Sequence, residues 1–349
     1  VRNHLIFSQA SQRIDIADPD AMHHFATQIG DRRHLEYLYV LSVADIYSTN
    51  KKLWTSWRAE QMRTLYRATR NILRRGLDNP VNKEQWVDEI QQSVIERLRE
   101  HGYQEQEVFN LWANPGDEYF LRESVDTLVW HALALFEHGS SDKPLVLISD
   151  TSDAAFEGAT QIFIYMQNQP QLFAAMTAAL DQLHLNIQDA RIITSQNNNA
   201  LDTYIVLDEK GEPITELARL EKIKLTLEKT LANPAEYSEL IQRRTSRQLK
   251  QFEFKPLVNL SNDPFNRRSC LEVIAPDRPG LLARMGKLFM EYGLSLDTAK
   301  ILTEGEKVDD IFYLKDKNGQ PISDPDFCRE LQAAVIEALT EQVELQATL

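Results

Sequence analysis

The stretches Asn168-Gln-Pro-Gln-Leu-Phe173 and Asp277-Arg-Pro-Gly-Leu-Leu282 lie 109 residues apart and align with each other. The alignment continues downstream, with one residue dropped between the two copies. The further matched pairs include Met176 with Met285, Ala190 with Ala299, Asp202 with Asp310, and Gly211-Glu-Pro-Ile214 with Gly319-Gln-Pro-Ile322. So many matches with a single gap indicate an internal duplication.

Each copy has the pattern strand, helix, strand, strand, helix. Apolar residues alternate in the first strand of each copy, as expected where one face of a strand is buried. These residues are Ile162, Ile164 and Met166 in the first copy and Leu271, Val273 and Ala275 in the second. We expect a last strand near residues 252–260 to complete the first copy. The result is the order βαββαβ, which is the ferredoxin-like pattern.

The turn between the first strand and helix of the second copy carries residues suited to binding a small ligand. Gly280 lets a ligand approach the backbone, and the free N–H groups of a helix N-terminus can receive a carboxylate. Asp277 can bind an α-ammonium or amide group. The alternative is that Asp-Arg-Pro-Gly is only a favourable turn and helix start.

A βαββαβ unit with this turn closely resembles an ACT domain, a small regulatory module that binds amino acids. The resemblance implies an amino-acid site at Asp277, Arg278, Gly280, Leu281 and Leu282. The matching positions of the first copy are Asn168, Gln169, Gln171 and Leu172. Three of these depart from the Asp, Arg and Gly of the second copy. The first pocket is therefore altered, empty, or part of a site shared between the copies.

The front of the chain reads as helical. Apolar spacing and capping residues predict helices over about 19–30, 32–49, 56–75, 84–101 and 124–138. The second of these is apolar on nearly every face, which predicts a buried helix. Asp45 lies within it, and a buried carboxylate is costly unless it is hydrogen-bonded, ion-paired or bound to a metal. Both a metal-ligand role and a structural role remain open for Asp45.

The third of these helices carries a row of arginines on one face. The row consists of Arg63, Arg67, Arg70 and Arg74. Guanidinium groups in register can bind phosphate or an acidic partner. The alternative is an ordinary solvated helix face.

Composition limits the class of protein. Hydrophobic residues make up 43% of the 349 residues and charged residues 26%, which is typical of a globular chain of two or three domains. The sequence has no apolar run long enough for a membrane span. The net charge of −14 argues against nucleic-acid binding. The two cysteines, Cys270 and Cys328, suit a reducing cytoplasm.

The order of the parts narrows the resemblance further. A helical stretch ending Leu-Ser-Val-Ala-Asp45-Ile-Tyr-Ser-Thr-Asn50, a basic helix with tryptophans, and two ACT repeats resemble the C-terminal part of the bacterial PII uridylyltransferase/uridylyl-removing enzyme family. We therefore expect a multidomain α + (α+β) fold. Residues 1–138 are expected to hold the end of an HD phosphohydrolase domain plus connector helices. Residues 139–260 and 261–349 are expected to form two ferredoxin-like ACT domains.

The resemblance also implies a function. Members of the family uridylylate the PII nitrogen-signalling protein when glutamine is scarce and remove the UMP when glutamine is plentiful. Asp45 would be the last ligand of a divalent Mg or Mn site in the HD domain, and the family's His-His pair corresponds to Asn3-His4, which leaves the role of His4 open. UTP and UMP chemistry would belong to domains outside this chain. The opening Val1-Arg2-Asn3-His4, without a starting Met, suits a piece of a longer polypeptide whose catalytic set is incomplete here and which is inactive alone.

Two further readings stay open at this stage. One is a stand-alone amino-acid-binding ACT regulator whose helical front docks a partner. The other, compatible with either, is that the ACT repeats pair side by side with those of a second copy in a homo-oligomer.

Overall fold

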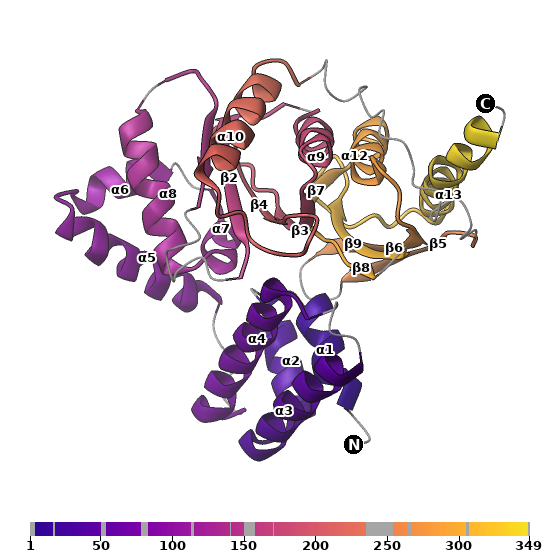
Figure 1. The fold of residues 1–349 in the computed structure, drawn as a ribbon. Coiled ribbons are helices and arrows are strands. Elements are labelled where there is room, and N and C mark those ends of the chain that lie inside the picture. The colour runs from indigo at the N-terminus through magenta and orange to yellow at the C-terminus, as the bar shows by residue number, and fades with distance from the viewer. Residues whose placement is uncertain are drawn as a thin grey trace.

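A computed structural model describes residues 4–16, 18–49, 54–77, 83–112, 115–139, 141–149, 158–169, 171–234, 254–263, 267–304 and 307–347. A helical front is followed by a long antiparallel sheet covered with helices (Figure 1). This order confirms the predicted fold class, a helical part followed by strands and helices in ACT-like arrangement.

The front consists of eight helices within the described residues. Their bounds are α1 His4–Arg13, α2 Pro19–Ile29, α3 Arg32–Thr49, α4 Ser56–Arg75, α5 Lys83–Glu100, α6 Glu105–Trp112, α7 Asp117–Arg122 and α8 Val125–His138. The five helices predicted in this region are confirmed. Caps explain several of the starts, because the side chains of Asp18, Thr55 and Ser124 accept hydrogen bonds from backbone N–H groups in the first turns of α2, α4 and α8.

Helix α3 is less buried than its composition predicts. Its buried residues are Leu35, Ser42 and Ile46. Tyr37, Val40, Leu41 and Tyr47 are exposed, with Val40 retaining 65% of its accessible surface. The prediction of an all-round buried helix is therefore wrong, because the described helices α1, α2 and α4 cover one side of α3 only. Asp45 lies half-buried at the edge of the covered side.

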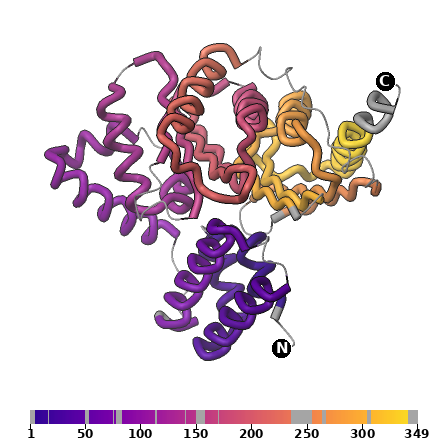
Figure 2. Tube along the Cα trace, in the orientation of Figure 1, coloured from indigo at the N-terminus to yellow at the C-terminus, as the bar shows by residue number. Residues whose placement is uncertain are grey.

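The helical front has two separate cores. Helices α1 to α4 pack around Phe7, Phe25 and Leu65. Helices α5 to α8 pack around Val94, Trp112 and Leu128, and this second core continues onto Phe163 and Leu201 of the sheet. The helical region 1–138 is thus built as two units, which Figure 2 shows as the indigo and purple groups.

The strands and helices of the back half repeat each other. The first repeat contains β1 Leu145–Ile148, β2 Thr160–Gln167, α9 Leu172–Gln182, β3 Asn186–Arg191, β4 Asn199–Leu207 and α10 Leu217–Ala232. The second contains β5 Leu257–Asp263, β6 Arg268–Pro276, α12 Leu281–Glu291, β7 Ser295–Lys300, β8 Thr303–Glu304, β9 Lys307–Lys315 and α13 Pro325–Ala347. The strands form one sheet in the order β1-β2-β4-β3-β7-β9-β6-β5, with β8 paired to β9.

The two repeats meet at the middle of this sheet. Strands β3 and β7 pair antiparallel, with Ala190 opposite Ala299. Above them α9 packs against α12, and Gly286 of α12 allows the close approach. A Cβ atom at Gly286 would lie 2.8 Å from Cδ1 of Phe173. The repeats therefore share one continuous core.

The strand predicted to close the first repeat belongs to the second. Strand β5 pairs antiparallel with β6, for example Leu260 with Leu271. The first repeat instead receives its edge strand from β1, which pairs with β2. In each repeat, the edge strand therefore comes directly before the first strand of the βαβ part in sequence and pairs with it antiparallel. The predicted boundary between residues 260 and 261 falls inside β5. The extra helix predicted after Asn233-Pro234 lies outside the described residues.

The two faces of the sheet serve different neighbours. Helices α9, α10, α12 and α13 cover one face, here called the helix face (Figure 1). The alternating residues predicted to point inward, such as Ile162, Ile164, Leu271 and Val273, are buried there, which confirms that pattern. The opposite face receives α5 to α8 over β2 and β4 and the end of α1 over β6, β7 and β9. No helix among the described residues is both long and apolar enough to cross a membrane.

Candidate functional site

The turn after β6 leads into a helix, as its sequence predicts. Gly280 is buried and adopts the left-handed conformation, with φ of 77°. It is the N-cap residue of α12 and, as a glycine, contributes no side-chain cap to that helix. Asp277 and Arg278 lie half-buried before it, and Leu281 is buried while Leu282 packs against the core. The predicted residues of the second repeat are therefore brought together around one helix N-terminus.

The equivalent turn of the first repeat is held by internal hydrogen bonds. The backbone N–H of Asn168 donates to the carbonyl of Asn198 at 2.9 Å, and its side-chain amide donates to Oγ1 of Thr194 at 3.2 Å. Gln171 precedes α9 with a negative φ, so the left-handed glycine of the second repeat has no counterpart here. Gln169 and Leu172 adjoin this turn, whereas Pro170 lies outside the described residues. The two turns therefore differ in conformation as well as in sequence.

The predicted metal residue Asp45 lies half-buried in α3. Within the described residues, no group of three or more His, Cys, Asp and Glu side chains could hold a metal ion. His4 begins α1, and its side chain lies outside what the structure describes. The described residues do not by themselves form a divalent-metal site.

The arginine row lies on the solvent side of α4. Arg70 and Arg74 are exposed. Arg63 is 3.1 Å from Glu60 and Arg67 is 4.0 Å from it, so part of the positive charge is balanced on the same helix. The row keeps its predicted spacing and remains accessible to an acidic group.

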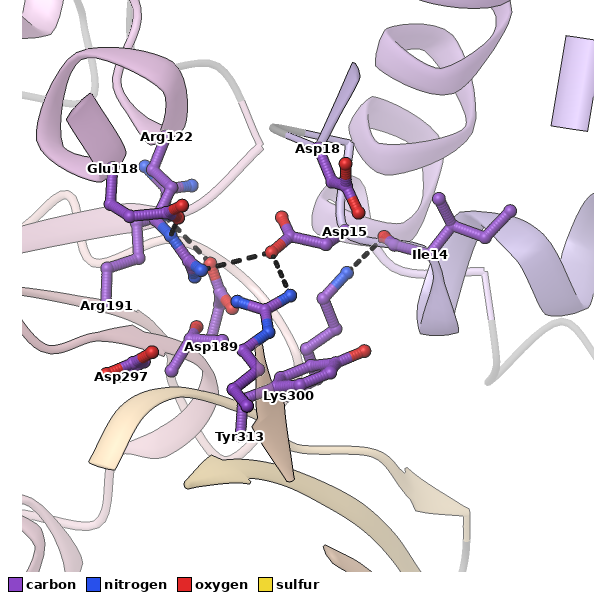
Figure 3. A network of polar contacts seen from close by, with 12 residues as sticks. Ile14, Asp15, Asp18, Glu118, Arg122, Asp189, Arg191, Asp297, Lys300 and Tyr313 are labelled. Carbon is purple, nitrogen blue, oxygen red and sulfur yellow. Dashed lines mark hydrogen bonds and ion pairs between the residues drawn. The ribbon is translucent and has the colours of Figure 1, made fainter. Parts of the chain in front are cut away.

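A buried cluster of charges joins the front to the sheet, and the sequence did not predict it. Asp15 lies between α1 and α2, and its Oδ2 accepts hydrogen bonds from Arg122 of α7 at 3.1 Å and from Arg268 of β6 at 2.9 Å (Figure 3). Lys300 of β7 donates to the carbonyl of Ile14. The guanidinium of Arg268 also lies 4.0 Å from the ring centroid of Tyr313. Asp15 thus links α7 and the second repeat to the first two helices.

The electrostatics of this cluster favour an ionised Asp15. Burial alone raises the pKa of a carboxyl group, but the positive charges of Arg122, Lys300 and Arg268 outweigh it and hold the pKa of Asp15 well below its usual value. Burial lowers the pKa of Lys300, against the opposing charge of Asp15. The cluster is therefore a charged network that depends on all its members.

A second group of charges lies alongside, on the same face of the sheet. Arg191 of β3 donates to Glu123 at 2.6 Å and to Asp189 at 3.0 Å. Burial raises the pKa of Glu123, and Arg191 opposes the increase. Glu123, which lies between α7 and α8, is thereby bonded to β3. Asp189 and Arg191 lie next to the Asp15 cluster (Figure 3).

The two groups border a cavity of about 510 Å³ between α4, α7 and the middle of the sheet. Acidic and basic side chains from both groups line it together with Trp57 and Trp86, and Arg67 contributes from the arginine row. The sequence carries no local signal for this cavity, because its walls come from segments more than 100 residues apart. Asp15 and Arg268 are 253 residues apart and show no mutual spacing that a motif search would detect.

Comparison with known proteins agrees with this arrangement. Residues 82–134, which contain most of α5 to α8, match the model described as Uridylyltransferase GlnD fifth domain. Residues 271–322, which contain the turn at Asp277, match the model of the ACT domain. No solved structure matches the chain.

Nearly the whole chain is similar to part of several longer proteins. A protein named bifunctional uridylyltransferase/uridylyl-removing enzyme from Stutzerimonas stutzeri is 48% identical over 99% of this chain. Proteins of the same name from Pseudomonas aeruginosa and Azotobacter vinelandii are each 48% identical over 98% of it. The chain spans 39% of the length of the first relative and 38% of the other two.

Proposed function

We propose that this chain is the glutamine-sensing regulatory portion, together with part of an HD phosphohydrolase domain, of an enzyme that uridylylates and deuridylylates the PII signalling protein. The observation that carries the proposal is the 48% identity over 99% of the chain to proteins named for these two opposed activities. The chain spans about two-fifths of such a protein. We therefore assign the UTP- and UMP-dependent steps to the remainder of a longer polypeptide.

Glutamine is the proposed allosteric ligand, and the second repeat is its proposed site. The turn at Asp277 leads into the N-terminus of α12, which favours a carboxylate, and Asp277 supplies a carboxylate for an ammonium group. The first repeat is a poorer candidate, because Asn168 already bonds to Thr194 and Asn198. Because only the turn at Asp277 is a good candidate, we propose that each chain binds a single ligand.

The front is proposed to complete a larger helical domain. The exposed residues Tyr37, Val40 and Tyr47 lie on one side of α3, and an exposed apolar stripe on a helix marks a surface that another element covers. Asp45 borders this stripe. A divalent Mg or Mn ion at Asp45 would need ligands from outside the described residues, so we assign no chemical step to this part of the chain.

The remaining proposals concern partners and location. The arginine row Arg63–Arg74 is proposed to bind either a phosphate group or an acidic group of PII. Cys270 and Cys328 are not joined in a disulfide, which supports a cytoplasmic location. A homo-oligomer formed through the ACT repeats remains a proposal.

A stand-alone amino-acid-binding regulator is the alternative. The observation in its favour is that no metal-ligand cluster surrounds Asp45 in the described residues. A substitution of Asp45 in a longer protein that includes this sequence distinguishes the enzyme portion from the stand-alone regulator. Loss of UMP removal from modified PII after Asp45→Ala in such a protein supports the first proposal, and unchanged UMP removal supports the alternative.

Calorimetric titration of the 349-residue chain with L-glutamine tests the sensor. We expect binding by the unaltered chain, weaker binding by Asp277→Ala, and unchanged binding by Asn168→Ala, which is the matched position of the first repeat. Absence of binding by the unaltered chain would refute the glutamine assignment. Equal binding by all three proteins would move the site away from Asp277.

A further inference from the structure

Asp310 is a buried acid on the helix face of β9. The residue retains 1% of its accessible surface and lies opposite Val273 of β6, the strand that leads into the turn at Asp277. Phe312, two residues further along β9, packs against Phe289 of α12 with ring centroids 5.3 Å apart. Because side chains alternate along a strand, Asp310 faces the same helix as Phe312.

One oxygen of Asp310 has a clear structural role and the other has none. Oδ1 accepts a hydrogen bond from the backbone N–H of Leu302 at 3.2 Å. Oδ2 is buried and has no hydrogen-bond partner among the residues that the structure describes. A buried polar atom without a partner is rare and costs free energy, so its retention requires a reason. Burial, with a further contribution from the nearby charge of Asp277, raises the pKa of Asp310 well above its usual value.

The unpartnered oxygen points to a missing cation. The charge of Asp277 acts on Asp310, and Asp277 lies in the turn that leads into α12, where the helix N-terminus favours a negative group. A positive group between the two carboxyls would relieve their repulsion and satisfy Oδ2. A zwitterionic amino acid carries both the positive and the negative group that such a site requires.

We propose that Oδ2 of Asp310, together with the carboxylate of Asp277, binds the ammonium group of an amino-acid ligand whose carboxylate lies at the first turn of α12. This inference rests on the proposed sensor function and names the group of the ligand that the site recognises. Binding ionises Asp310, so its proton passes to solvent as the ammonium group enters. The titratable groups that act on Asp310 are Asp277 in the turn and Asp309 beside it on β9.

The first repeat contains a matched position that lacks the second acid. Asp202 is equally buried, and its Oδ1 accepts the backbone N–H of Ile193 at 3.2 Å. The residue that corresponds to Asp277 is Asn168, whose side-chain amide bonds to Thr194. Asp202 thus shares the structural hydrogen bond of Asp310 without the pair of carboxyl groups, which makes it the control position.

Titration calorimetry with L-glutamine compares the unaltered chain with Asp310→Asn and Asp202→Asn. Asparagine retains the acceptor for the backbone N–H, so the fold is preserved. We expect Asp310→Asn to weaken binding by about tenfold or more, as loss of a charged hydrogen bond does, and Asp202→Asn to leave it within about twofold. Titrations in buffers of different ionisation enthalpy should show proton release by the unaltered chain and none by Asp310→Asn.

A change in the ligand supplies a test that needs no variant. 4-Carbamoylbutanoate is glutamine without its ammonium group, and the unaltered chain should bind it at least about tenfold more weakly than glutamine. Comparable binding of the two compounds overturns the inference, as does tight glutamine binding by Asp310→Asn, and in both cases glutamine sensing itself stands. If the unaltered chain binds no glutamine, the sensor proposal fails and this inference fails with it.

Discussion

Asp309 and Asp310 are consecutive residues of β9 whose carboxylates serve opposite faces of the sheet. Asp310 lies under α12 on the helix face, whereas both carboxylate oxygens of Asp309 accept from Arg13 of α1 at 3.0 Å. Leu302 connects them, because its N–H donates to Asp310 and its carbonyl accepts from the N–H of Asp309 at 2.8 Å. Asp310, the residue proposed to bind the ligand, is therefore adjacent in sequence to a residue that contacts the helical front.

Arg13→Ala should remove the contact between the helical front and Asp309 of the second repeat with little loss of stability. Arg13 bridges Glu272 at 3.2 Å and Asp309, but its side chain is 45% exposed, and exposed ion pairs contribute less than about 1 kcal/mol to folding. Hydrogen exchange in α1 should respond to glutamine in the unaltered chain and no longer respond in the variant. Arg32→Ala, which removes an exposed pair with Glu36, is the control. A glutamine response that survives Arg13→Ala would show that the signal takes another route.

Asp15→Asn should destabilise the chain strongly. The substitution leaves Arg122 and Arg268 buried without their shared carboxylate, and breaking a buried ion pair costs about 3–5 kcal/mol. Denaturant unfolding at neutral pH measures this loss. Asp142→Asn, at an exposed position, should change the free energy of unfolding by less than about 0.5 kcal/mol.

Acid should reproduce part of the same effect in the unaltered chain. The pKa of Asp15 is held below its usual value in the folded state, so the unfolded chain takes up the proton first as the pH falls. The stabilisation is complete above about pH 4, the pKa of an unperturbed aspartate, and decreases as the pH falls toward the folded-state pKa. The unfolding free energy of Asp15→Asn should lack this part of the acid dependence. Identical acid slopes for both proteins would exclude Asp15 as the group responsible.

Gly286→Ala should destabilise the contact between the two repeats. Alanine normally stabilises a helix relative to glycine by up to about 1 kcal/mol, but here the added Cβ would lie 2.8 Å from Phe173 and 3.2 Å from Cα of Ala174. Overpacking of this kind typically costs about 1–3 kcal/mol. Thermal unfolding shows whether Gly286→Ala raises or lowers stability. Phe173→Leu combined with Gly286→Ala should recover part of the loss. A more stable single variant would mean that α9 and α12 separate easily.

The local features of this fold were predictable, whereas the contacts between its parts were not. The alternating apolar residues from Ile162 to Met166 predicted strand β2, and the cap at Ser124 predicted the start of α8. The internal duplication predicted the ACT-like order of strands and helices. The pairing of β5 with β6 was missed, because a strand between two repeats can join either edge and the pattern of side chains is the same in both cases.

The candidate site divides in the same way. The turn at Asp277 was visible because its residues are adjacent in sequence, and the helix start at Leu281 follows from them. Asp15, Arg122 and Arg268 come from three distant segments, so their mutual charge balance becomes visible only when the chain is folded. The burial of α3 was overestimated, since apolar content alone does not show whether the covering helices are present.

Asp202→Asn should stabilise the chain at neutral and alkaline pH. Burial raises the pKa of Asp202 to about 8 from its ordinary value of 3.8, and the hydrogen bond from the backbone N–H of Ile193 only partly opposes this increase. Below about pH 4 both the folded and unfolded chains carry the proton, and the substitution should change little. Between pH 4 and 8 the unfolded chain loses the proton while the folded chain keeps it, so the unaltered protein loses stability as the pH rises. Each pKa unit corresponds to about 1.4 kcal/mol, and we expect the variant to be more stable by about 2 kcal/mol or more at pH 8.

Urea unfolding from pH 4 to 9 measures the difference in unfolding free energy between the unaltered chain and Asp202→Asn, with Asp88→Asn on the exposed side of α5 as control. Parallel stability curves for the unaltered chain and Asp202→Asn would show that Asp202 is ionised in the folded state and that a partner compensates its charge.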